Sequence, residues 1–336
     1  MQNTDTLPLA VLDLATIPSG GAASETFRAS VTVAQAVEKM GYRRYWFAEH
    51  HSIDSIASSS PAVLIAHIAA HTERIRVGAG GVMLPNHSPL VIAEQFGTLE
   101  ELHPGRIDLG LGRAPGGDRA IYDALRRDPM ASQYFPQDVA ELQMLLGDRD
   151  PERVVQAIPG YETYVPLIIL GSSLFGAQLA AAMGLPYGFA SHFAPDALEQ
   201  AVEIYRRKFE PSKQLEKPYV IAGFNVYAAD STEQAEVLYR DALRRMAISL
   251  ATRVGVADDI PDDILMNSPA GMHAKKMLHY SAVGDAETVG KQVEEFKRHA
   301  DADELIVVSN IIDTDARIRS YEILAGEVAK LTPAAK

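Results

Sequence analysis

Three adjacent ionisable side chains follow a short apolar run, namely Glu49, His50 and His51. Histidine titrates near neutral pH, so it is the usual general acid or base of enzymes. A neighbouring carboxylate can raise the pKa of a histidine or fix its tautomer. A structural role is the alternative, with one histidine exposed and the other capping the next segment. Because no two histidines here flank an acid at a four-residue spacing, we expect no metal site.

Glycines are concentrated at the end of a second apolar run, at Gly78, Gly80 and Gly81. Glycine weakens the interior of a strand, so its repeated use there needs a reason. One reason is a flat ligand that must approach the backbone closely, or a backbone in an unusual conformation. The alternative is a bulge at the corner of a barrel.

Arg113 follows a third run, directly after Gly-Leu-Gly. An arginine at the end of a strand is a natural clamp for a phosphate or carboxylate, although a salt bridge to a nearby acid is the alternative. The glycines do not form a dinucleotide-binding fingerprint. Proline occupies residue 115, where the helix should open, and no third glycine has the required spacing.

Two serines, Ser172 and Ser173, follow a fourth run and open a predicted helix that includes Gly176. Serine hydroxyls and the free N–H groups of a helix N-terminus form an anion site. Simple capping of the helix is the alternative, and the two roles are compatible.

Short apolar runs alternate with amphipathic stretches along the chain. Runs of four to nine apolar residues are typical of strands buried on both faces of a parallel sheet. The predicted strands are Leu9–Leu14, Arg44–Ala48, Ile75–Val82, Arg106–Leu111, Val165–Leu170, Tyr187–Ala190, Tyr219–Tyr227 and Glu304–Val308. The predicted helices between and after them are Glu25–Met40, Ser60–His71, Pro89–Leu102, Gln137–Leu146, Ser173–Met183, Pro195–Phe209, Ser231–Ala251, Ala286–His299 and Thr314–Lys330.

Eight strands, each followed by a helix, indicate an α/β fold of the (β/α)8 TIM-barrel type rather than an open sheet. In such a barrel the carboxyl ends of the strands form the site, which would bring the residues above together. A bare barrel needs about 250 residues. We assign the excess of this 336-residue chain to insertions after strands 4 and 7, at about 113–165 and 255–285, within one domain spanning 1–336. Both insertions are expected to cover the site.

Composition excludes several classes of protein. The net charge of −13 argues against nucleic-acid partners and anionic membranes. The absence of cysteine excludes disulfides, thiolate nucleophiles and Cys-ligated metals, and fits a cytoplasmic location. The polar N-terminus does not suit a signal peptide. The uncharged segment 163–195 is interrupted by glycine, serine and proline, so we interpret it as buried strand, helix and strand rather than a membrane span.

Together these motifs resemble the bacterial luciferase-like family of flavin-dependent oxidoreductases, in particular a single-chain bacterial subgroup. The resemblance covers almost the whole chain, and it is specific through the order and spacing of its pieces. They are Tyr45–His51, Arg76–His87, Pro104–Arg113, Leu185–Phe193, Tyr280–Gly284 and Asp303–Val307.

The resemblance implies a barrel that binds FMN across the strand ends. The flavin would be used reduced, supplied by a separate NAD(P)H-dependent reductase that associates transiently, and would react with O2 and a small organic substrate. His50 matches the catalytic histidine of the family, Gly80–Gly81 a non-prolyl cis peptide under the flavin ring, and Arg113 a phosphate arginine. Ser172, Ser173 and Gly176 lie where luciferases place their phosphate-binding helix start.

Departures from the luciferases limit the resemblance. Luciferases have an acidic residue and a threonine in place of Ser172 and Gly176, and their reactive pocket cysteine has no counterpart in this chain. A second phosphate arginine has no obvious counterpart near Phe135-Pro136. Light emission is therefore not implied. The leading hypothesis is an FMN-dependent monooxygenase, with Glu49 and His51 assisting His50.

Several alternatives remain open. The same barrel could use the deazaflavin F420 for hydride transfer without oxygen, or bind flavin without turnover. A phosphate-substrate isomerase or aldolase is a more distant possibility, since no lysine ends a predicted strand as a Schiff-base enzyme requires. The small residues of helix 60–71 favour a homodimer that pairs through this helix and the next, although packing onto the barrel also explains them.

Overall fold

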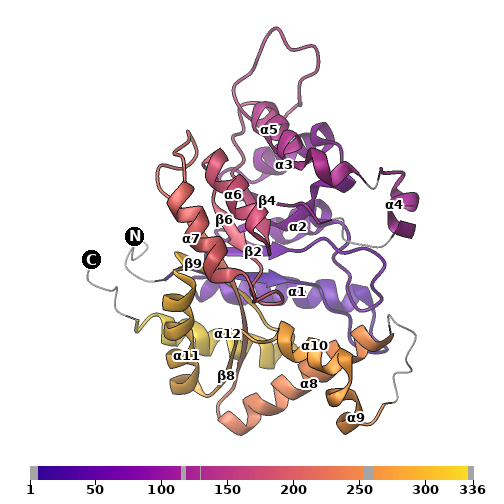
Figure 1. Cartoon of the computed structure of the whole chain (residues 1–336), viewed down its shortest axis with the longest axis vertical. Helices are drawn as coiled ribbons and strands as arrows, with labels where there is room; N and C mark the ends of the chain where they lie inside the picture. Colours follow the sequence, from indigo (N-terminus) through magenta and orange to yellow (C-terminus); the bar gives the residue numbers. More distant parts are fainter. Residues whose placement is uncertain (1–6, 115–118, 129, 253–259, 332–336) are drawn as a thin grey trace.

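The structure is a computed structural model that describes residues 7–114, 119–128, 130–252 and 260–331. Its sheet contains nine strands in these residues. They are β1 (Leu9–Asp13), β2 (Arg44–Phe47), β3 (Arg76–Met83), β4 (Ile107–Gly112), β5 (Leu167–Gly171), β6 (Tyr187–Phe189), β7 (Val220–Ala228), β8 (Ser281–Gly284) and β9 (Glu304–Val308). The order is β6-β5-β4-β3-β2-β1-β9-β7, and pairing of β6 with β7 closes the ring. Every pairing is parallel, so this is the expected (β/α)8 barrel (Figure 1).

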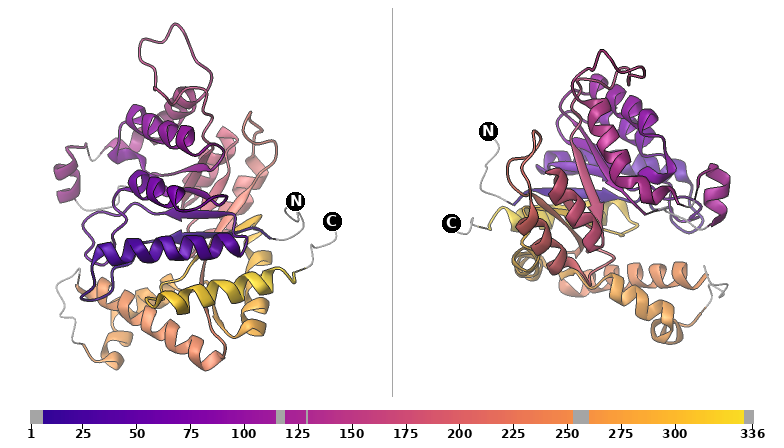
Figure 2. Two further views of the ribbon diagram at one scale, coloured as in Figure 1. Left: turned by 180° about the vertical axis from the view of Figure 1, so that it is seen from behind. Right: turned by 45° about the horizontal axis from the view of Figure 1, so that its top comes forward.

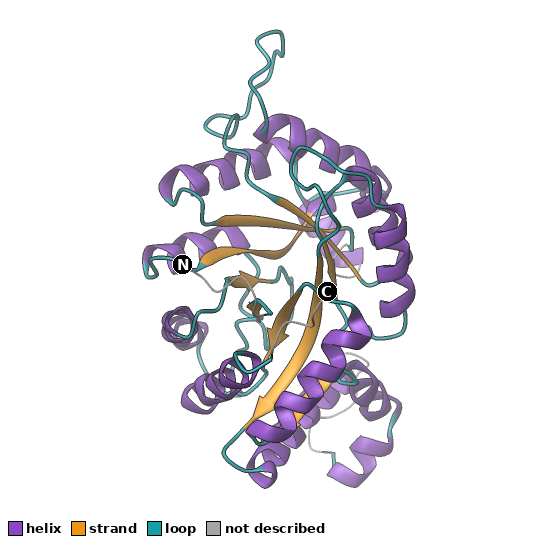
Figure 3. Ribbon diagram, turned by 90° about the vertical axis from the view of Figure 1, so that its left-hand side faces the viewer, coloured by secondary structure: helices purple, strands orange, loops and turns teal. Residues whose placement is uncertain are grey.

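Helices surround this ring of strands (Figure 3). They are α1 (Ala23–Lys39), α2 (Pro61–Ala70), α3 (Pro89–Leu102), α4 (Arg119–Leu125), α5 (Phe135–Leu146), α6 (Leu174–Met183), α7 (Leu198–Lys208), α8 (Thr232–Thr252), α9 (Asp262–Asn267), α10 (Pro269–Met277), α11 (Ala286–Ala300) and α12 (Thr314–Val328). Two short 3-10 helices add Leu84–Asn86 and Ala131–Tyr134. The caps are those expected of such helices: Gly41 has φ 86° just after α1, and Gly184 has φ 62° after α6.

The ninth strand, β8, is a correction to the expected eight. It lies within the second predicted insertion and pairs only with the carboxyl half of β7, from Asn225 to Ala228. The first half of β7 pairs with β6 and β9, which complete the barrel. Its four residues are Ser-Ala-Val-Gly and alternate in burial, so they lack the continuous apolar run by which the other strands are recognised.

Alternate residues of the strands face the two sides of the barrel wall. Val11, Tyr45 and Val307 belong to the large core under the helices. Leu12, Trp46 and Ile306 belong to a smaller apolar cluster, which fills the barrel interior. The interior is thus a packed core, as in other barrels of this type.

The amino end of the barrel interior is closed by buried charges. Asp108 accepts hydrogen bonds from Arg44 Nη1 at 2.6 Å, Arg76 Nη2 at 2.7 Å and Trp46 Nε1 at 3.0 Å. Arg44 Nε also donates to Glu304 Oε1 at 2.8 Å. Burial alone would raise the pKa of Asp108, but the two guanidinium groups lower it. The network joins β2, β3, β4 and β9 at the end opposite the predicted site.

The uncharged segment 163–195 forms β5, α6 and β6, as predicted from its interruptions. Among the described residues, no helix has the length and apolar character needed to cross a membrane.

The two parts of the first predicted insertion lie at different ends of the barrel. Helix α4 and the 3-10 helix Ala131–Tyr134 lie between β4 and α5, whereas residues 147–166 connect α5 to β5. A segment that leads from a helix into the next strand lies at the amino end of a barrel. The loop at 147–164 protrudes beside α3 and α5 (Figures 1 and 2), so this part of the first insertion does not cover the site. Residues 115–118, 129 and 255–259 of the insertions lie outside the described residues.

Candidate active site

The predicted chemical groups follow strands β2 to β5, so the parallel barrel places them at one end. Glu49, His50 and His51 follow β2, and Gly80 and Gly81 lie near the end of β3. Arg113 follows β4 directly, and the serines follow β5. The order of the barrel, β2-β3-β4-β5, therefore sets these groups side by side around its rim.

Glu49 is the centre of a hydrogen-bonded cluster at the end of β2. Its side chain is buried, and Oε1 accepts from Nε2 of His51 and from Nε2 of His87, each at 2.8 Å. Its other oxygen, Oε2, accepts the backbone N–H of Met83 at 2.9 Å. Glu49 thus joins the loop after β2 to the 3-10 turn after β3.

These bonds set the charges of the cluster. Burial alone would raise the pKa of Glu49, but the hydrogen bonds from His51 and His87 outweigh it and lower this pKa to about 2. The bond to Glu49 in turn raises the pKa of His51, against a smaller opposing effect of burial. Glu49 is therefore an anion at neutral pH that favours the protonated form of His51.

His50 follows Glu49 in the chain and interacts electrostatically with a further histidine, His192. Its backbone N–H donates to the carbonyl of Ser58 at 3.0 Å, which fixes the loop. Burial and the nearby His50 lower the pKa of His192 to about 4. His192 follows β6, and its carbonyl accepts a bond from Asn225 Nδ2 of β7 at 2.8 Å. A neutral His192 imidazole therefore lies near His50 at neutral pH.

The peptide bond between Gly80 and Gly81 is cis. The register of β3 against β4 shifts between Ala79 and Val82, as the alternative interpretation of the glycines, a bulge, would produce. A Cβ on Gly80 would lie 2.7 Å from Leu12 Cδ1, and one on Gly81 would lie 2.7 Å from the carbonyl oxygen of Gly110. Close packing inside the barrel wall therefore accounts for both glycines, independently of any ligand.

Arg113 and the start of α6 come together across β4 and β5. The guanidinium carbon of Arg113 lies 4.1 Å from the centre of the Phe175 ring, in the first turn of α6. Ser173 is the N-cap residue in extended conformation, yet its side chain makes no capping bond. Gly171 and Gly176 face each other here, with 3.7 Å from a Cβ on the former to Cα of the latter.

This second group has the composition of an anion site. The first N–H groups of a helix have no partner within the helix, and the helix dipole favours negative charge there. An arginine and two exposed serine hydroxyls surround that point, at Arg113, Ser172 and Ser173. A salt bridge was the alternative role for Arg113. Among the described residues Arg113 forms no salt bridge, and its guanidinium lies over the Phe175 ring instead.

Three residues of the site were not predicted from the sequence: His87, His192 and Asn225. His192 follows a strand just as His50 does, so the rule that selects strand ends could have found it. His87 is separated from β3 by the 3-10 turn, and Asn225 lies inside a strand. No local spacing marks either of these two, because their partners come from distant parts of the chain.

The histidines and acid after β2 do not form a metal centre by the geometry of the described residues, and no other cluster of three such ligands occurs in these ranges. The structure instead places two chemical groups around one rim. One consists of Glu49 and the histidines around it, and the other consists of Arg113 and the serines at the start of α6.

Comparison with known proteins gives these groups a context. A family model described as luciferase-like monooxygenase matches residues 7–303. A protein of Escherichia coli strain K12 named luciferase-like monooxygenase is 48% identical over 324 residues, which cover 95% of this chain and 96% of that one. The crystal structure of apo-MsnO8 is 32% identical, with a TM-score of 0.82 over 98% of this chain and 100% of that chain.

Two more distant structures share the fold. One is the oxygenating constituent of 3,6-diketocamphane monooxygenase of Pseudomonas putida in complex with FMN, 17% identical with a TM-score of 0.70 over 98% of this chain and 100% of that one. The other is an F420-dependent secondary alcohol dehydrogenase in complex with an F420–acetone adduct, 15% identical with a TM-score of 0.69 over 96% and 99%. The match over residues 7–303 and the identity of 48% to the Escherichia coli protein show that the chain belongs to the luciferase-like monooxygenase family.

Proposed function

We propose that this protein is a monooxygenase that uses reduced FMN and O2 to oxidise a small organic substrate. The observation that carries the proposal is the pairing of Arg113 with the open N-terminus of α6, at the end of the barrel that also holds His50. An anion held there would leave the rest of a ligand to extend across β4 and β3 toward the histidines.

The residues present suit the FMN phosphate. Arg113, the hydroxyls of Ser172 and Ser173, and the first N–H groups of α6 supply charge and donors. Gly176 lets this helix start pack closely on β6, since a Cβ there would lie 3.3 Å from the Tyr187 ring. When bound, reduced FMN supplies the electrons with which O2 is activated. A separate NAD(P)H-dependent reductase would provide it in that form.

The protein's own groups then control protons and water. His50 would donate or accept a proton at the reacting oxygen, with a neutral His192 beside it. Glu49 would act as a positioning residue, because it fixes His51, His87 and the backbone of Met83 around that point. Helix α4 and the second insertion would limit the access of water.

A homodimer through α2 and α3 accompanies the proposal. The two helices pack against each other and leave Val63 68% exposed and Val91 44% exposed. Light scattering coupled to size-exclusion chromatography tests the dimer.

Anaerobic titration with reduced FMN, and separately with reduced F420, tests the cofactor. We expect saturable binding of reduced FMN, at least tenfold tighter than that of F420. On mixing with oxygenated buffer, bound FMN should reoxidise more slowly than free FMN. Tighter binding of F420 would favour the hydride-transfer alternative, since an F420-dependent enzyme has the same fold. Saturable flavin binding with no oxygen-dependent change would indicate a non-catalytic flavin protein.

Substitution of Arg113 tests the phosphate subsite separately. A charge-assisted hydrogen bond is worth about 1.5–3 kcal/mol. Arg113→Met should therefore reduce the affinity for reduced FMN by about 10-fold to 100-fold. The affinity for reduced riboflavin, which lacks the phosphate, should stay as in the wild type. Arg74→Met, an exposed arginine before β3, is the matched control. Equal weakening of FMN and riboflavin would contradict the assignment of Arg113 to the phosphate.

A further inference from the structure

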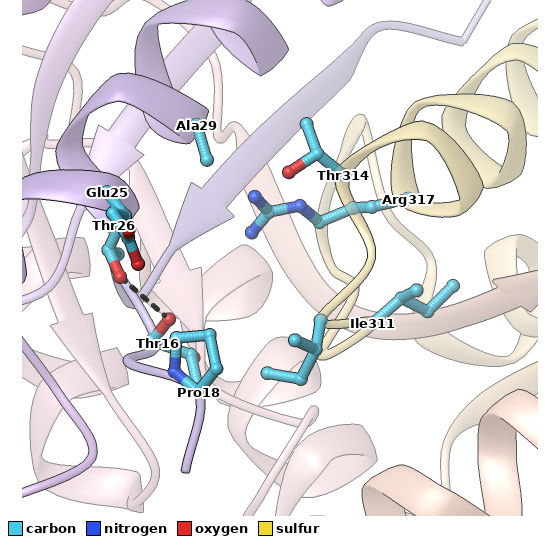
Figure 4. Close-up of a pocket in the computed structure, with 9 residues that line it drawn as sticks. Thr16, Pro18, Glu25, Thr26, Ala29, Ile311, Thr314 and Arg317 are labelled. Carbon is cyan, nitrogen blue, oxygen red and sulfur yellow. Dashed lines mark hydrogen bonds between the residues drawn. The ribbon is translucent and has the colours of Figure 1, made fainter. Parts of the chain in front are cut away.

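A separate pocket lies at the carboxyl end of the strands, where the loops after β1 and β9 meet the starts of α1 and α12 (Figure 4). It shares no residue with the groups described above. Its volume is about 130 Å³, and its walls come from the loop after β1, the first turns of α1, the loop after β9 and the start of α12. Its principal lining residues are Thr16, Thr26, Ala29, Ile311, Thr314 and Arg317.

Arg317 is the unusual member of this pocket. It is only 9% exposed, and its guanidinium points into the pocket in Figure 4. Its Nε is buried without a hydrogen-bond partner, and within the described residues no side-chain hydrogen bond of Arg317 is found. The nearest carboxylate oxygen, Oδ1 of Asp13, lies 3.9 Å from Nη1, beyond hydrogen-bond length. Buried donors usually have hydrogen-bond partners. The Nε–H of Arg317 is therefore unusual in having no acceptor among the described residues.

Asp13 does not supply that acceptor at this distance, and its oxygens accept hydrogen bonds from other groups. Oδ2 accepts from the hydroxyl of Ser30 at 2.6 Å and from that of Tyr45. Oδ1 accepts the backbone N–H of Ala15 at 2.8 Å. The arginine is therefore left with a distant charge partner and an open side toward the pocket.

The walls define the class of ligand. Thr314 directs its hydroxyl toward the guanidinium in Figure 4, whereas the hydroxyl of Thr26 already donates to the carbonyl of Thr16 at 3.3 Å. Ala29 and Ile311 form an apolar side. Glu25 adds a carboxylate at the exposed edge, held by a 3.5 Å bond from the N–H of Ala22.

These features favour one charge on the ligand rather than two. Asp13 lies 3.9 Å from Arg317 and Glu25 lines the pocket, so their negative charges repel a dianion such as phosphate more strongly than a monoanion. The planar fork of arginine matches a carboxylate with two parallel bonds. At about 30 Å³ for each water-sized group, the volume holds a ligand of about four or five non-hydrogen atoms.

We propose that this pocket binds a small monocarboxylate, with its oxygens on Arg317 and Thr314 and its short alkyl chain against Ile311 and Ala29. The site is distinct from the proposed flavin site and does not depend on it.

Titration of the full-length protein with sodium propionate tests the proposal, by isothermal calorimetry and by the shift of the melting temperature against sodium chloride of equal ionic strength. We expect saturable binding of propionate and a higher melting temperature. Neutral propionamide and inorganic phosphate should each bind at least tenfold more weakly. Equal binding of propionamide, or tighter binding of phosphate, would overturn the proposed ligand class.

Variants locate the site. Arg317→Met should weaken the binding of propionate at least tenfold, and Thr314→Val should weaken it about threefold. Glu25→Gln should strengthen the binding of propionate. Arg319→Met is the matched control, since Arg319 lies on the same helix with a half-exposed side chain paired to Asp230 and Glu322. If Arg317→Met fails to fold, the opposite effects of Thr314→Val and Glu25→Gln decide. Propionate binding that none of these variants changes would place the ligand elsewhere and refute the site.

Discussion

At the scale of single residues, the site depends on a buried carboxylate with three hydrogen bonds. Glu49 accepts from two imidazoles and one backbone N–H, so each of its bonds orients a different segment. It raises the pKa of His51, whereas burial and His50 lower the pKa of His192 to about 4. The pKa values of these two histidines at one rim are thus shifted in opposite directions.

Glu49 should stabilise the protein in a pH-dependent way. Its pKa in the folded protein is about 2, below the ordinary value of 4.5. A lowered acid pKa contributes stability above the unfolded value, which is lost as the pH falls through the folded value. The full contribution is about 3 kcal/mol. We expect the difference in unfolding free energy between wild type and Glu49→Gln to shrink between pH 5 and pH 2.5, measured by urea denaturation.

The exposed Glu73 provides the control for this measurement. Glu73→Gln should show no such change over the same range. A difference between wild type and Glu49→Gln that stays constant from pH 5 to pH 2.5 would show that the ionised carboxylate is not what stabilises this end of the barrel.

His50 should affect turnover rather than flavin binding. General acid–base catalysis contributes about 10²-fold to 10⁴-fold to a rate. His50→Asn should therefore reduce turnover by about 10²-fold or more, with affinity for reduced FMN within twofold of wild type. Steady-state rates with a supplied flavin reductase measure turnover, and anaerobic titration measures the affinity for reduced FMN. His273→Asn on α10, an exposed histidine, should leave both unchanged. A large loss of flavin affinity in His50→Asn would assign His50 to binding instead.

At the scale of elements, strands β3 and β4 approach so closely that glycine is required at particular positions. A Cβ on Gly110 would lie 2.2 Å from the carbonyl oxygen of Ala79, which belongs to the backbone and cannot move aside. A Cβ on Gly112, two residues along the same strand, would meet only the Val82 oxygen at 3.7 Å. The same residue type thus has different importance at two positions of one strand.

This pair makes a matched test of the β3–β4 contact. Overpacking in a well-packed region costs about 1–3 kcal/mol, and a clash with backbone lies at the upper end. Gly110→Ala should lower the urea midpoint accordingly, whereas Gly112→Ala should leave it nearly unchanged. Equal midpoints for the two variants would mean that β3 relaxes away from β4 at little cost.

The elements differ in how far the sequence alone predicts them. The eight barrel strands are recognisable because each is buried on both faces and is therefore a continuous apolar run. Strand β8 was missed because Ser-Ala-Val-Gly is short and only half buried. The site residues at strand ends were predictable by position, but the bond from His87 to Glu49 spans 38 residues of chain. Such a contact depends on how β2 and β3 pair, which no local pattern specifies.

At the scale of the whole molecule, the candidate active site and the buried charge network lie at opposite ends of the barrel. Glu49, His50 and Arg113 follow strands, at the carboxyl end. Four strands are joined at the amino end by Asp108, Arg44, Arg76 and Glu304, which are charged and mostly buried. Since this network touches none of the site residues, its loss should act on stability without a direct effect on the chemistry.

Asp108 is the residue on which that separation can be tested. Removal of one partner from a buried ion pair costs about 3–5 kcal/mol, because the remaining charge stays buried and unpaired. Asp108→Asn should reduce the unfolding free energy by about 3 kcal/mol or more, measured by urea denaturation. Adding Arg76→Gln should cost less than the sum of the two single changes, since the two groups interact directly at 2.7 Å.

Glu287→Gln, which breaks an exposed ion pair on α11, is the control and should change the unfolding free energy little. If the folded Asp108→Asn protein binds reduced FMN as wild type does, the two ends are independent; a selective loss of FMN binding would show that the network also shapes the site.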